Sequence, residues 1–433
     1  MHHNDASVAA AGVTMTGDHN WPAAAVSRTD STAEPHLRRT LTLPLVVLYG
    51  LGVTIGAGIY VLVGATAGVA GALAPLSFVL AALVMLPSAC SFAELVGRFP
   101  VSAGEAAYVG AGLRRPELAV LVGLMVVVVG TVSAAAICVG SVGYIRQFVD
   151  LSDLILVPFV VAAMTFIAAW GVRESVTFAA VLTGVEILGL VIVIAAGLLV
   201  RPAVPITELV WPSTSMMGLG FAIMSGGILA FFAFVGFEDL VNIAEETETP
   251  ERTLPRAIFI TLGVSTLLYV LVAFAAVLNV PTHELATAKA PLSLVFERTT
   301  HASPAVISAI AIVATLNGVI VQIIMASRVV YGLSRQDSLP RWLGYVHPVT
   351  RTPLVATAII GTSVYVLATI APLRGLAETT SLITLTIFAF VNLALLQIKR
   401  RDEPAPTGTF MVPFWVPIIG LVSCALFLIV GLF

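Results

Sequence analysis

The chain alternates long apolar stretches with short polar connections, and eleven of these stretches are long enough to cross a bilayer as helices. One such helix needs about 20 mostly apolar residues. The strict two-residue alternation of barrel strands is absent. The pattern therefore predicts an all-α polytopic membrane protein. The eleven candidate spans are residues 42–65, 73–97, 118–145, 154–171, 176–200, 217–243, 256–280, 304–333, 353–371, 376–398 and 411–432.

The composition agrees with this pattern, because 58% of the 433 residues are hydrophobic and only 10% are charged. Soluble domains carry roughly 25% charged residues, so most of the outer surface here is expected to meet the lipid bilayer. Residues 1–40 are polar and lack the apolar core of a signal peptide. We expect them to form a disordered tail.

The loops carry an uneven distribution of positive charge. If the N-terminus is cytoplasmic, sixteen of the 21 Lys and Arg residues fall in inside segments and five fall outside. Cytoplasmic loops are enriched in these residues. The bias predicts a multi-pass protein of the cell (inner or plasma) membrane with a cytoplasmic N-terminus and, with eleven spans, an external C-terminus.

The first span contains four glycines in nine residues: Gly50, Gly52, Gly56 and Gly58. Each glycine costs a helix roughly 1 kcal/mol relative to Ala. Gly52 and Gly56 could serve close helix packing, or the stretch could be unwound so that its backbone faces a ligand. The segment alone does not decide between these interpretations.

The sixth span has a glycine at a matching place, Gly236, followed by Glu238 and Asp239. Spans one and six correspond in two halves of five helices, and an odd-numbered repeat inserts with opposite topology. Interrupted spans at matching positions of inverted repeats indicate a transporter site. The candidate binding residues are Thr54, Ile55, Gly56, Ala57 and Gly58 at the first break and Phe232, Ala233, Phe234, Val235 and Gly236 at the second.

Broken helices expose free N–H groups on one half and free carbonyls on the other. The N–H groups suit a carboxylate, and the carbonyls suit an ammonium group or another cation. We expect the N–H groups around Gly56 and Gly58 to hold the carboxylate, and the carbonyls of Phe232, Ala233 and Val235 to hold the amine. An α-amino acid is the smallest common solute that satisfies both ends.

Four segments resemble the amino acid–polyamine–organocation permeases, especially the cationic amino acid transporter branch. They begin with Gly52-Val53-Thr54-Ile55-Gly56-Ala57-Gly58-Ile59-Tyr60. The second is Ala93-Glu94-Leu95 with Phe99-Pro100 and residues 102–108. The third is residues 231–246 with residues 250–256, and the fourth is residues 327–331 with Leu339-Pro340, Val346-His347-Pro348 and Thr352-Pro353.

The resemblance implies a LeuT-type fold of two inverted five-helix repeats and a secondary transporter working by alternating access. We expect a cytoplasmic tail at 1–40, repeats at 41–200 and 215–398, and a cytoplasmic loop with one further helix at 399–433. It also suggests that Phe232 and Phe234 line or cover the substrate. Two departures are Glu105, where the family often has Gly, and Glu238-Asp239, which replaces a common Asp-Ala.

A single carboxylate, Glu186, lies about 15 Å into the fifth span, near the expected midplane. Such a group is costly in the membrane and indicates function. In proton-coupled relatives with a similar Gly-Val-x-Glu-Ser start a lysine falls here, so that mechanism does not transfer. Glu186 is expected to carry the coupling proton. A hydrogen bond to a neighbouring helix or a Na⁺ site are the alternatives.

Other charged residues are expected at the cytoplasmic ends of spans. Glu94 and Glu245 are predicted to form ion pairs that close a cytoplasmic gate, with Arg98, Arg252, Arg256 and Arg328 on the same side. Glu238 is a further coupling or gating candidate, while Glu105 and Glu246 are interpreted as solvated charges. Asn317 and Gln322, inside the eighth span, are expected to hydrogen-bond neighbouring helices.

Other functions fit the sequence less well. The net charge of −3 offers no basic surface for nucleic acid, and the three cysteines lie in apolar runs that predict no metal or cofactor site. A membrane-embedded enzyme is the alternative of another class, but its usual motifs are missing, as is a channel filter. A polyamine or ethanolamine permease of the same fold would leave the N–H groups of the first break unpaired.

Overall fold

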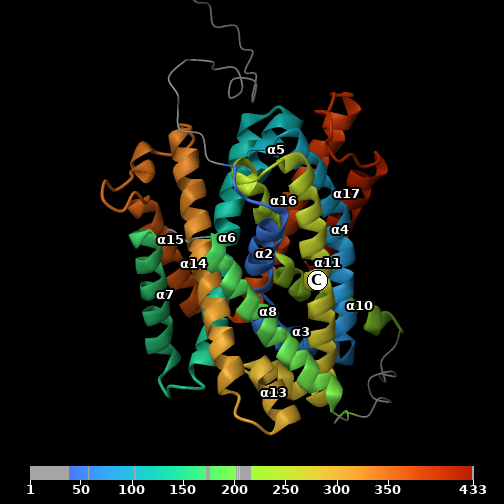
Figure 1. Ribbon diagram of the computed structural model, residues 1–433, viewed down its shortest axis with the longest axis vertical. Coiled ribbons are helices and arrows are strands. Elements are labelled where there is room, and N and C mark those ends of the chain that lie inside the picture. Colours follow the sequence, from blue (N-terminus) through green and yellow to red (C-terminus); the bar gives the residue numbers. More distant parts are fainter. Residues whose placement is uncertain are drawn as a thin grey trace, which may run out of the picture.

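Membrane-length helices run side by side between two ends of the molecule, one carrying α5 and the other carrying α13 (Figure 1). The computed structural model describes residues 39–56, 58–101, 104–171, 176–200, 202, 204 and 216–431. The helices in chain order are α2 (Leu43–Ile55), α3 (Gly58–Ala70), η1 (Gly71–Leu73), α4 (Ala74–Arg98), α5 (Gly104–Leu113), α6 (Pro116–Ile145), α7 (Asp153–Trp170), α8 (Val176–Leu199), α10 (Met216–Phe234), η2 (Phe237–Glu246), α11 (Pro250–Asn279), α12 (Thr282–Thr287), α13 (Pro291–Thr300), α14 (Ala305–Arg335), η3 (Arg341–Gly344), α15 (Leu354–Ile370), α16 (Leu373–Arg400) and α17 (Trp415–Val430).

The predicted all-helical membrane architecture is confirmed for the described residues. Eight helical stretches are long and apolar enough to span a bilayer, and three shorter apolar helices, Leu43–Ile55, Leu354–Ile370 and Trp415–Val430, accompany them. The extended structure among these residues is limited to one isolated bridge between Leu41 and Thr247.

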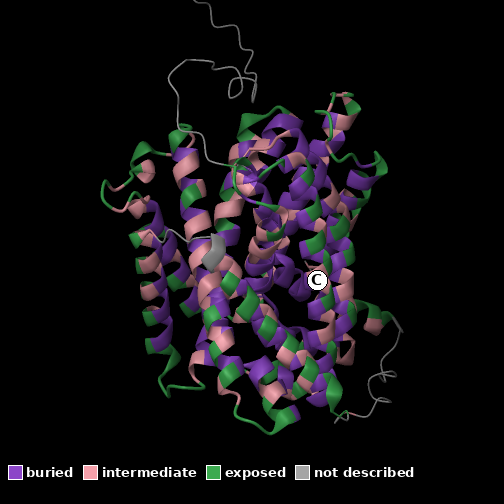
Figure 2. Cartoon of the chain, in the orientation of Figure 1, coloured by how far each residue is buried: buried purple, intermediate pink, exposed green. Residues whose placement is uncertain are grey.

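The outer surface is apolar where the helices face away from the bundle. On α7, Leu154, Phe159 and Trp170 are 83%, 70% and 68% exposed. Figure 2 shows exposed residues along the outer sides of the helices, while the interior is buried. Apolar residues of this extent on the outer surface are expected of helices that face lipid.

Both predicted interruptions are present. The first span divides into α2 and α3, with Gly56 after the last residue of α2 and Gly58 at the start of α3; Ala57 lies outside the described residues. The sixth span divides into α10 and the 3₁₀ segment η2, with Val235 and Gly236 between them. Both helices break at glycine residues, as the low helix propensity of glycine predicts.

The buried side chains form two hydrophobic clusters that meet at the interruptions. The first draws mainly on α2, α4, α10, α11 and α16, and the second mainly on α6, α7, α14 and α15. Phe234 belongs to the first cluster and Phe232, two residues earlier, to the second. The broken segment of α10 therefore lies at the seam between two packed bodies.

The chain entering α2 is tied to the chain leaving η2. The backbone N–H groups of Thr40 and Leu41 donate to the carbonyl of Glu246 at 2.9 and 3.0 Å, and the N–H of Glu248 donates to the carbonyl of Leu41 at 3.0 Å. These bonds couple the outer ends of the two interrupted segments, α2 and η2.

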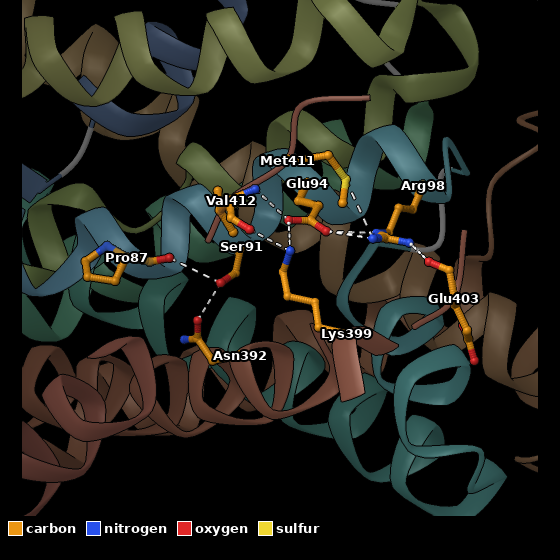
Figure 3. Close-up of polar contacts among 9 residues, drawn as sticks. All are labelled: Pro87, Ser91, Glu94, Arg98, Asn392, Lys399, Glu403, Met411 and Val412. Carbon is orange, nitrogen blue, oxygen red and sulfur yellow. Dashed lines mark hydrogen bonds and ion pairs between the residues drawn. The ribbon is translucent and has the colours of Figure 1, made fainter. Parts of the chain in front are cut away.

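Glu94 forms a buried ion-pair cluster near the α5 end (Figure 3). Its carboxylate is fully buried and lies 2.9 Å from the Arg98 guanidinium on α4 and 2.7 Å from Lys399 Nζ on α16. It also accepts the N–H of Val412 at 2.8 Å. Glu94 thus forms ion pairs with partners on α4 and α16, while the predicted role of these pairs in a cytoplasmic gate stays a prediction.

The same cluster fixes the loop between α16 and α17. Arg98 Nη1 donates to the carbonyl of Glu403 at 3.0 Å, and Lys399 Nζ donates to the carbonyl of Val412 at 2.7 Å (Figure 3). Both ends of the loop are therefore held by the cations that neutralise Glu94. The carboxylate connects α4, α16 and the approach to α17 in one network.

We expect Lys399→Met to destabilise the protein, because Glu94 then keeps only Arg98 as a partner. Removing one member of a buried pair typically costs about 3–5 kcal/mol, and the remaining Arg98 should reduce this cost. The apparent melting temperature in detergent measures the effect. Adding Glu94→Gln should restore part of the loss.

The matched control is Arg400→Met, since Arg400 is the exposed neighbour of Lys399. It should leave the melting temperature nearly unchanged. Equal losses in the two single variants would show that the cluster contributes no specific stabilisation.

Candidate functional site

The first interruption is held by close packing as well as by glycine. A Cβ added at Gly58 would collide with the backbone of Ala233 on α10, and one at Gly52 with the Thr183 side chain on α8. At Gly56 it would meet the Gly52 carbonyl at 2.9 Å and the Ala314 carbonyl at 3.3 Å. These contacts leave no room for a side chain at Gly52, Gly56 or Gly58, and they serve helix packing in this conformation.

The second interruption requires glycine for its backbone conformation. Gly236 has φ +125°, which L-residues rarely adopt, and a Cβ there would lie 3.0 Å from the Val53 carbonyl. The Gly236 N–H donates to Glu238 Oε2 at 2.8 Å. Glu238 thus satisfies a backbone N–H that the start of η2 leaves free.

One tyrosine joins the two interruptions. The Tyr269 hydroxyl on α11 lies 2.7 Å from the carbonyl of Thr54 and 2.9 Å from the carbonyl of Ala233. Both carbonyls belong to last turns, where the helix supplies no partner. The single phenol, fully buried, can donate to either carbonyl and holds the ends of α2 and α10 together.

Two further tyrosines fix the start of α3 to its neighbours. The Tyr144 hydroxyl on α6 donates to the carbonyl of Tyr60 at 2.5 Å, and the Tyr60 hydroxyl donates to the backbone carbonyl of Glu186 at 2.7 Å. A chain of phenols thereby links α6, α3 and α8 beside the first interruption.

The Glu186 side chain is buried, and no cation among the described residues neutralises its carboxylate. It is 0% exposed, and neither carboxylate oxygen meets the geometry of a full hydrogen bond among the described residues, although the Asn317 side chain is close enough to act as a donor. Asn317 of α14 lies beside it, and Oε2 would be 3.6 Å from a Cβ at Gly56. The carboxylate therefore stands at the meeting point of α2, α8 and α14, next to the first interruption.

The two interruptions face one small cavity, which we call the central cavity. Its volume is about 10 Å³, enough for about one water. The broken helices contribute Gly52, Val53, Thr54, Gly58, Phe232 and Val235. The opposite wall is formed by Ser133 and Ile137 of α6 and by Asn317, Gly318, Val321 and Gln322 of α14.

A second, acidic cavity of about 30 Å³ adjoins the central cavity and shares Val235 and Gln322 with it. It contains Glu105, Glu238 and Asp239, and we call it the acidic cavity. It adjoins a vestibule of about 520 Å³ between α5, α6 and α14, with which it shares Glu105, Val126 and Met325. Three spaces thus succeed one another from the interruptions to the α5 end.

The predicted binding residues divide between this path and the core. Thr54, Gly58, Phe232 and Val235 line the central cavity, whereas the other described candidates do not. Phe234 instead packs against Tyr269 with ring centroids 4.9 Å apart. The carbonyl of Phe232 accepts the N–H of Val235 at 3.1 Å, so two of the three carbonyls proposed for the amine have partners here.

The predicted gating residues do not gather in one place. Glu238 lines the acidic cavity, Glu94 belongs to the cluster with Lys399, and Glu245 is exposed at the end of η2. The interpretation of Glu105 as a solvated charge is wrong, because its side chain is only 6% exposed and α5 packs it against the bundle. Asn317 and Gln322 line the central cavity, a role that their positions in an apolar span alone did not reveal.

Comparison with known proteins places these observations in a family context. A protein-family model described as amino acid permease matches residues 41–433. The branched-chain amino acid permease BcaP of Bacillus subtilis is 30% identical over 93% of this chain and 90% of its own length. Human cationic amino acid transporter 4 is 28% identical over 88% and 63%, and the methylthioribose transporter of Bacillus subtilis is 26% identical over 90% and 87%.

We expect Tyr269→Phe to leave a folded protein with impaired transport. The change removes one hydroxyl and leaves a buried carbonyl unsatisfied, a loss of about 1–3 kcal/mol. Transport is measured as counterflow. The amino acid used is the one that raises the melting temperature most in a screen. Tyr365→Phe, the same change on an exposed position of α15, should retain wild-type counterflow; wild-type counterflow in Tyr269→Phe would contradict the role.

Glu105 should make stability depend on pH. Burial raises the pKa of this carboxyl, on α5 outside the spans, from 4.5 to about 7. Because the pKa is raised in the folded state, the contribution of the Glu105 carboxyl to the free energy of unfolding is fully present below pH 4.5. This contribution is lost as the pH rises through about 7. Between pH 4.5 and 8 the melting temperature should therefore fall less steeply with pH in Glu105→Gln than in wild type.

The exposed Glu117 on α6 provides the control for that titration. Glu117→Gln should follow the wild-type curve. If Glu105→Gln also ran parallel to wild type over the whole range, Glu105 would not be the titrating group.

Proposed function

Because the chain belongs to the amino acid permease family, it is a membrane transporter of amino acids and not an enzyme, and we propose that it works by alternating access. The amino acid is held in the central cavity between the interrupted first and sixth helices. The cavity is too small for an amino acid in this conformation, so binding requires the two packed bodies to separate slightly at their seam.

The observation that carries this proposal is the meeting of two helix breaks at one cavity. Gly58, the first residue of α3, lines the central cavity, and so do Phe232 and Val235 at the end of α10. A helix N-terminus favours a carboxylate, and a helix C-terminus favours an ammonium group. The arrangement supports a zwitterionic cargo. Thr54, Ile55, Gly56, Ala57, Ala233, Phe234 and Gly236 complete the proposed binding segments.

The arrangement of the short helices supports the proposed pair of inverted repeats. We assign residues 41–200 and 215–398 to the repeats, the 1–40 segment to a cytoplasmic tail, and 399–433 to a loop and one additional helix. In each half a short helix follows the second span, α5 in the first half and α12 with α13 in the second. α5 and α13 lie at opposite ends of the molecule (Figure 1), as an inverted repeat requires.

We assign the α5 end to the cytoplasm, following the distribution of Lys and Arg. This end carries the vestibule of about 520 Å³. At the other end α12 packs directly on α3, where a Cβ at Gly64 would collide with the Leu285 carbonyl. Lys289 also pairs there with Asp153 at 3.1 Å. The conformation accordingly resembles an inward-facing state. We assign Glu94 and Glu245 a gating role at its cytoplasmic end.

For energy coupling, we assign the proton to Glu186. Its carboxylate is buried at the junction of α2, α8 and α14, and it forms no ion pair among the described residues. Isolated carboxylates in a membrane interior mark proton or ion pathways. A proton neutralises the group without a further ligand, whereas Na⁺ would need several oxygen donors around it. Proton symport or exchange therefore suits the site better than sodium coupling.

Uptake into proteoliposomes under an imposed pH gradient, with and without Na⁺, tests the coupling. Glu186→Gln should lose accumulation driven by the gradient and keep counterflow, because Gln cannot exchange a proton but preserves the shape of the site. Glu117→Gln serves as the control and should accumulate substrate as wild type does. Full pH-driven accumulation by Glu186→Gln would exclude Glu186, and a wild type that required Na⁺ and ignored pH would replace the proton.

A further inference from the structure

The acidic cavity brings together three carboxylates that the binding of a zwitterion at the helix breaks does not use. Glu105 reaches it from the start of α5, and Glu238 and Asp239 reach it from η2. Glu105 and Glu238 are 6% and 7% exposed. None of the three forms an ion pair within 4 Å in the part of the chain that the structure describes. Three acidic groups thus share a confined space without a fixed cation.

The other walls of the acidic cavity supply no positive charge. α6 contributes Val126, Val129 and Gly130, α14 contributes Gln322, Met325 and Ala326, and α16 contributes Thr384, Ile387 and Phe388. Arg328, one turn beyond Met325 on α14, lines the vestibule instead. Buried carboxylates in such surroundings must be protonated or be matched by a cation from outside the chain.

A neutral side chain in the same cavity independently indicates a ligand. Thr384 is 2% exposed, and its hydroxyl has no hydrogen-bond partner among the described residues. Hydroxyl groups in apolar helices normally bond to their own backbone or to a neighbour, so an orphaned one at a cavity wall is available to an occupant. Gln322 lines both the acidic cavity and the central cavity.

The size of the cavity limits the occupant. About 30 Å³ accommodates one or two groups of water size, such as an ammonium group or a small monovalent ion. Among the described residues no three acidic, His or Cys side chains converge closely enough to hold a metal ion. The three carboxylates line the space from two elements, α5 and η2, without converging on one point, an arrangement that suits several N–H donors of one ammonium better than a compact ion.

We propose that the acidic cavity is a monovalent-cation subsite on the cytoplasmic release path, occupied by the ammonium group of the cargo as it leaves the central cavity. The proposal rests on the proposed function for its direction and its cargo. The shared residues Val235 and Gln322 on one side, and Glu105, Val126 and Met325 on the other, connect the subsite to the central cavity and to the vestibule. A departing ammonium group passes from backbone carbonyls to carboxylates before it reaches water.

Glu238 has a second task, and this affects the choice of variants. Its Oε2 accepts the Gly236 N–H at the break of α10, so replacing it could disturb the helix break as well as the cation subsite. Glu105→Gln and Asp239→Asn are the cleaner changes, because both retain size and remove only charge. Asn242 Nδ2 lies 3.5 Å from Asp239 Oδ1 and can keep that contact with an Asn.

Thermal stabilisation of the purified full chain in detergent tests the subsite without any transported amino acid. Methylammonium chloride and sodium chloride are titrated separately against choline chloride of equal concentration, since the quaternary ammonium of choline is too large for the cavity. A ligand of the folded state raises the melting temperature by mass action. We expect methylammonium to stabilise wild type and Glu117→Gln, and its apparent affinity to fall at least tenfold in Glu105→Gln and Asp239→Asn.

The outcomes separate the subsite from the proposed function. Stabilisation by sodium instead of methylammonium, lost in the same two variants, would support a cation subsite and assign it to an inorganic ion. No stabilisation by either salt, or stabilisation that both variants retain, would overturn the proposal. A protein that binds methylammonium in this way but fails amino acid counterflow would refute the proposed function and leave the subsite in place.

Discussion

The need to satisfy backbone groups away from water governs the rest of this structure. A spanning helix satisfies its own N–H and carbonyl groups, and a broken one does not. Here two helices break at adjacent points, and side chains from elsewhere satisfy the freed groups: Tyr269 serves Thr54 and Ala233, and Glu238 serves Gly236. The breaks persist because neighbouring helices supply these partners.

The same requirement explains why the breaks lie at a seam. Backbone groups that are to bind a solute must be reachable, which a single continuous core would prevent. Two hydrophobic clusters, one mainly around α4 and α11 and the other mainly around α6 and α14, leave a boundary where only a small cavity remains. Ligand exchange by relative movement at such a boundary costs less than opening a packed core, because fewer close contacts are lost.

The buried carboxylates fall into two groups, those that have cationic partners and those that do not. Glu94 has Arg98, Lys399 and the Val412 N–H, and it consolidates the loop before α17. Glu186 and the three carboxylates of the acidic cavity have no cationic partner within 4 Å among the described residues. Compensated carboxylates stabilise an assembly of helices, while uncompensated ones are available to protons or cations that come and go.

The sequence by itself determined the all-helical membrane class, the places of both interruptions and the isolation of Glu186, because these follow from local composition. Apolar runs set the helices, and Gly56, Gly58 and Gly236 mark where helices end. The partner of Glu94 on α16, the phenol that joins the breaks and the acidic cavity were decided only by tertiary structure. Lys399 lies 305 positions after Glu94, and Tyr269 lies 215 after Thr54. No local pattern encodes such pairings, since they depend on which helix faces pack together.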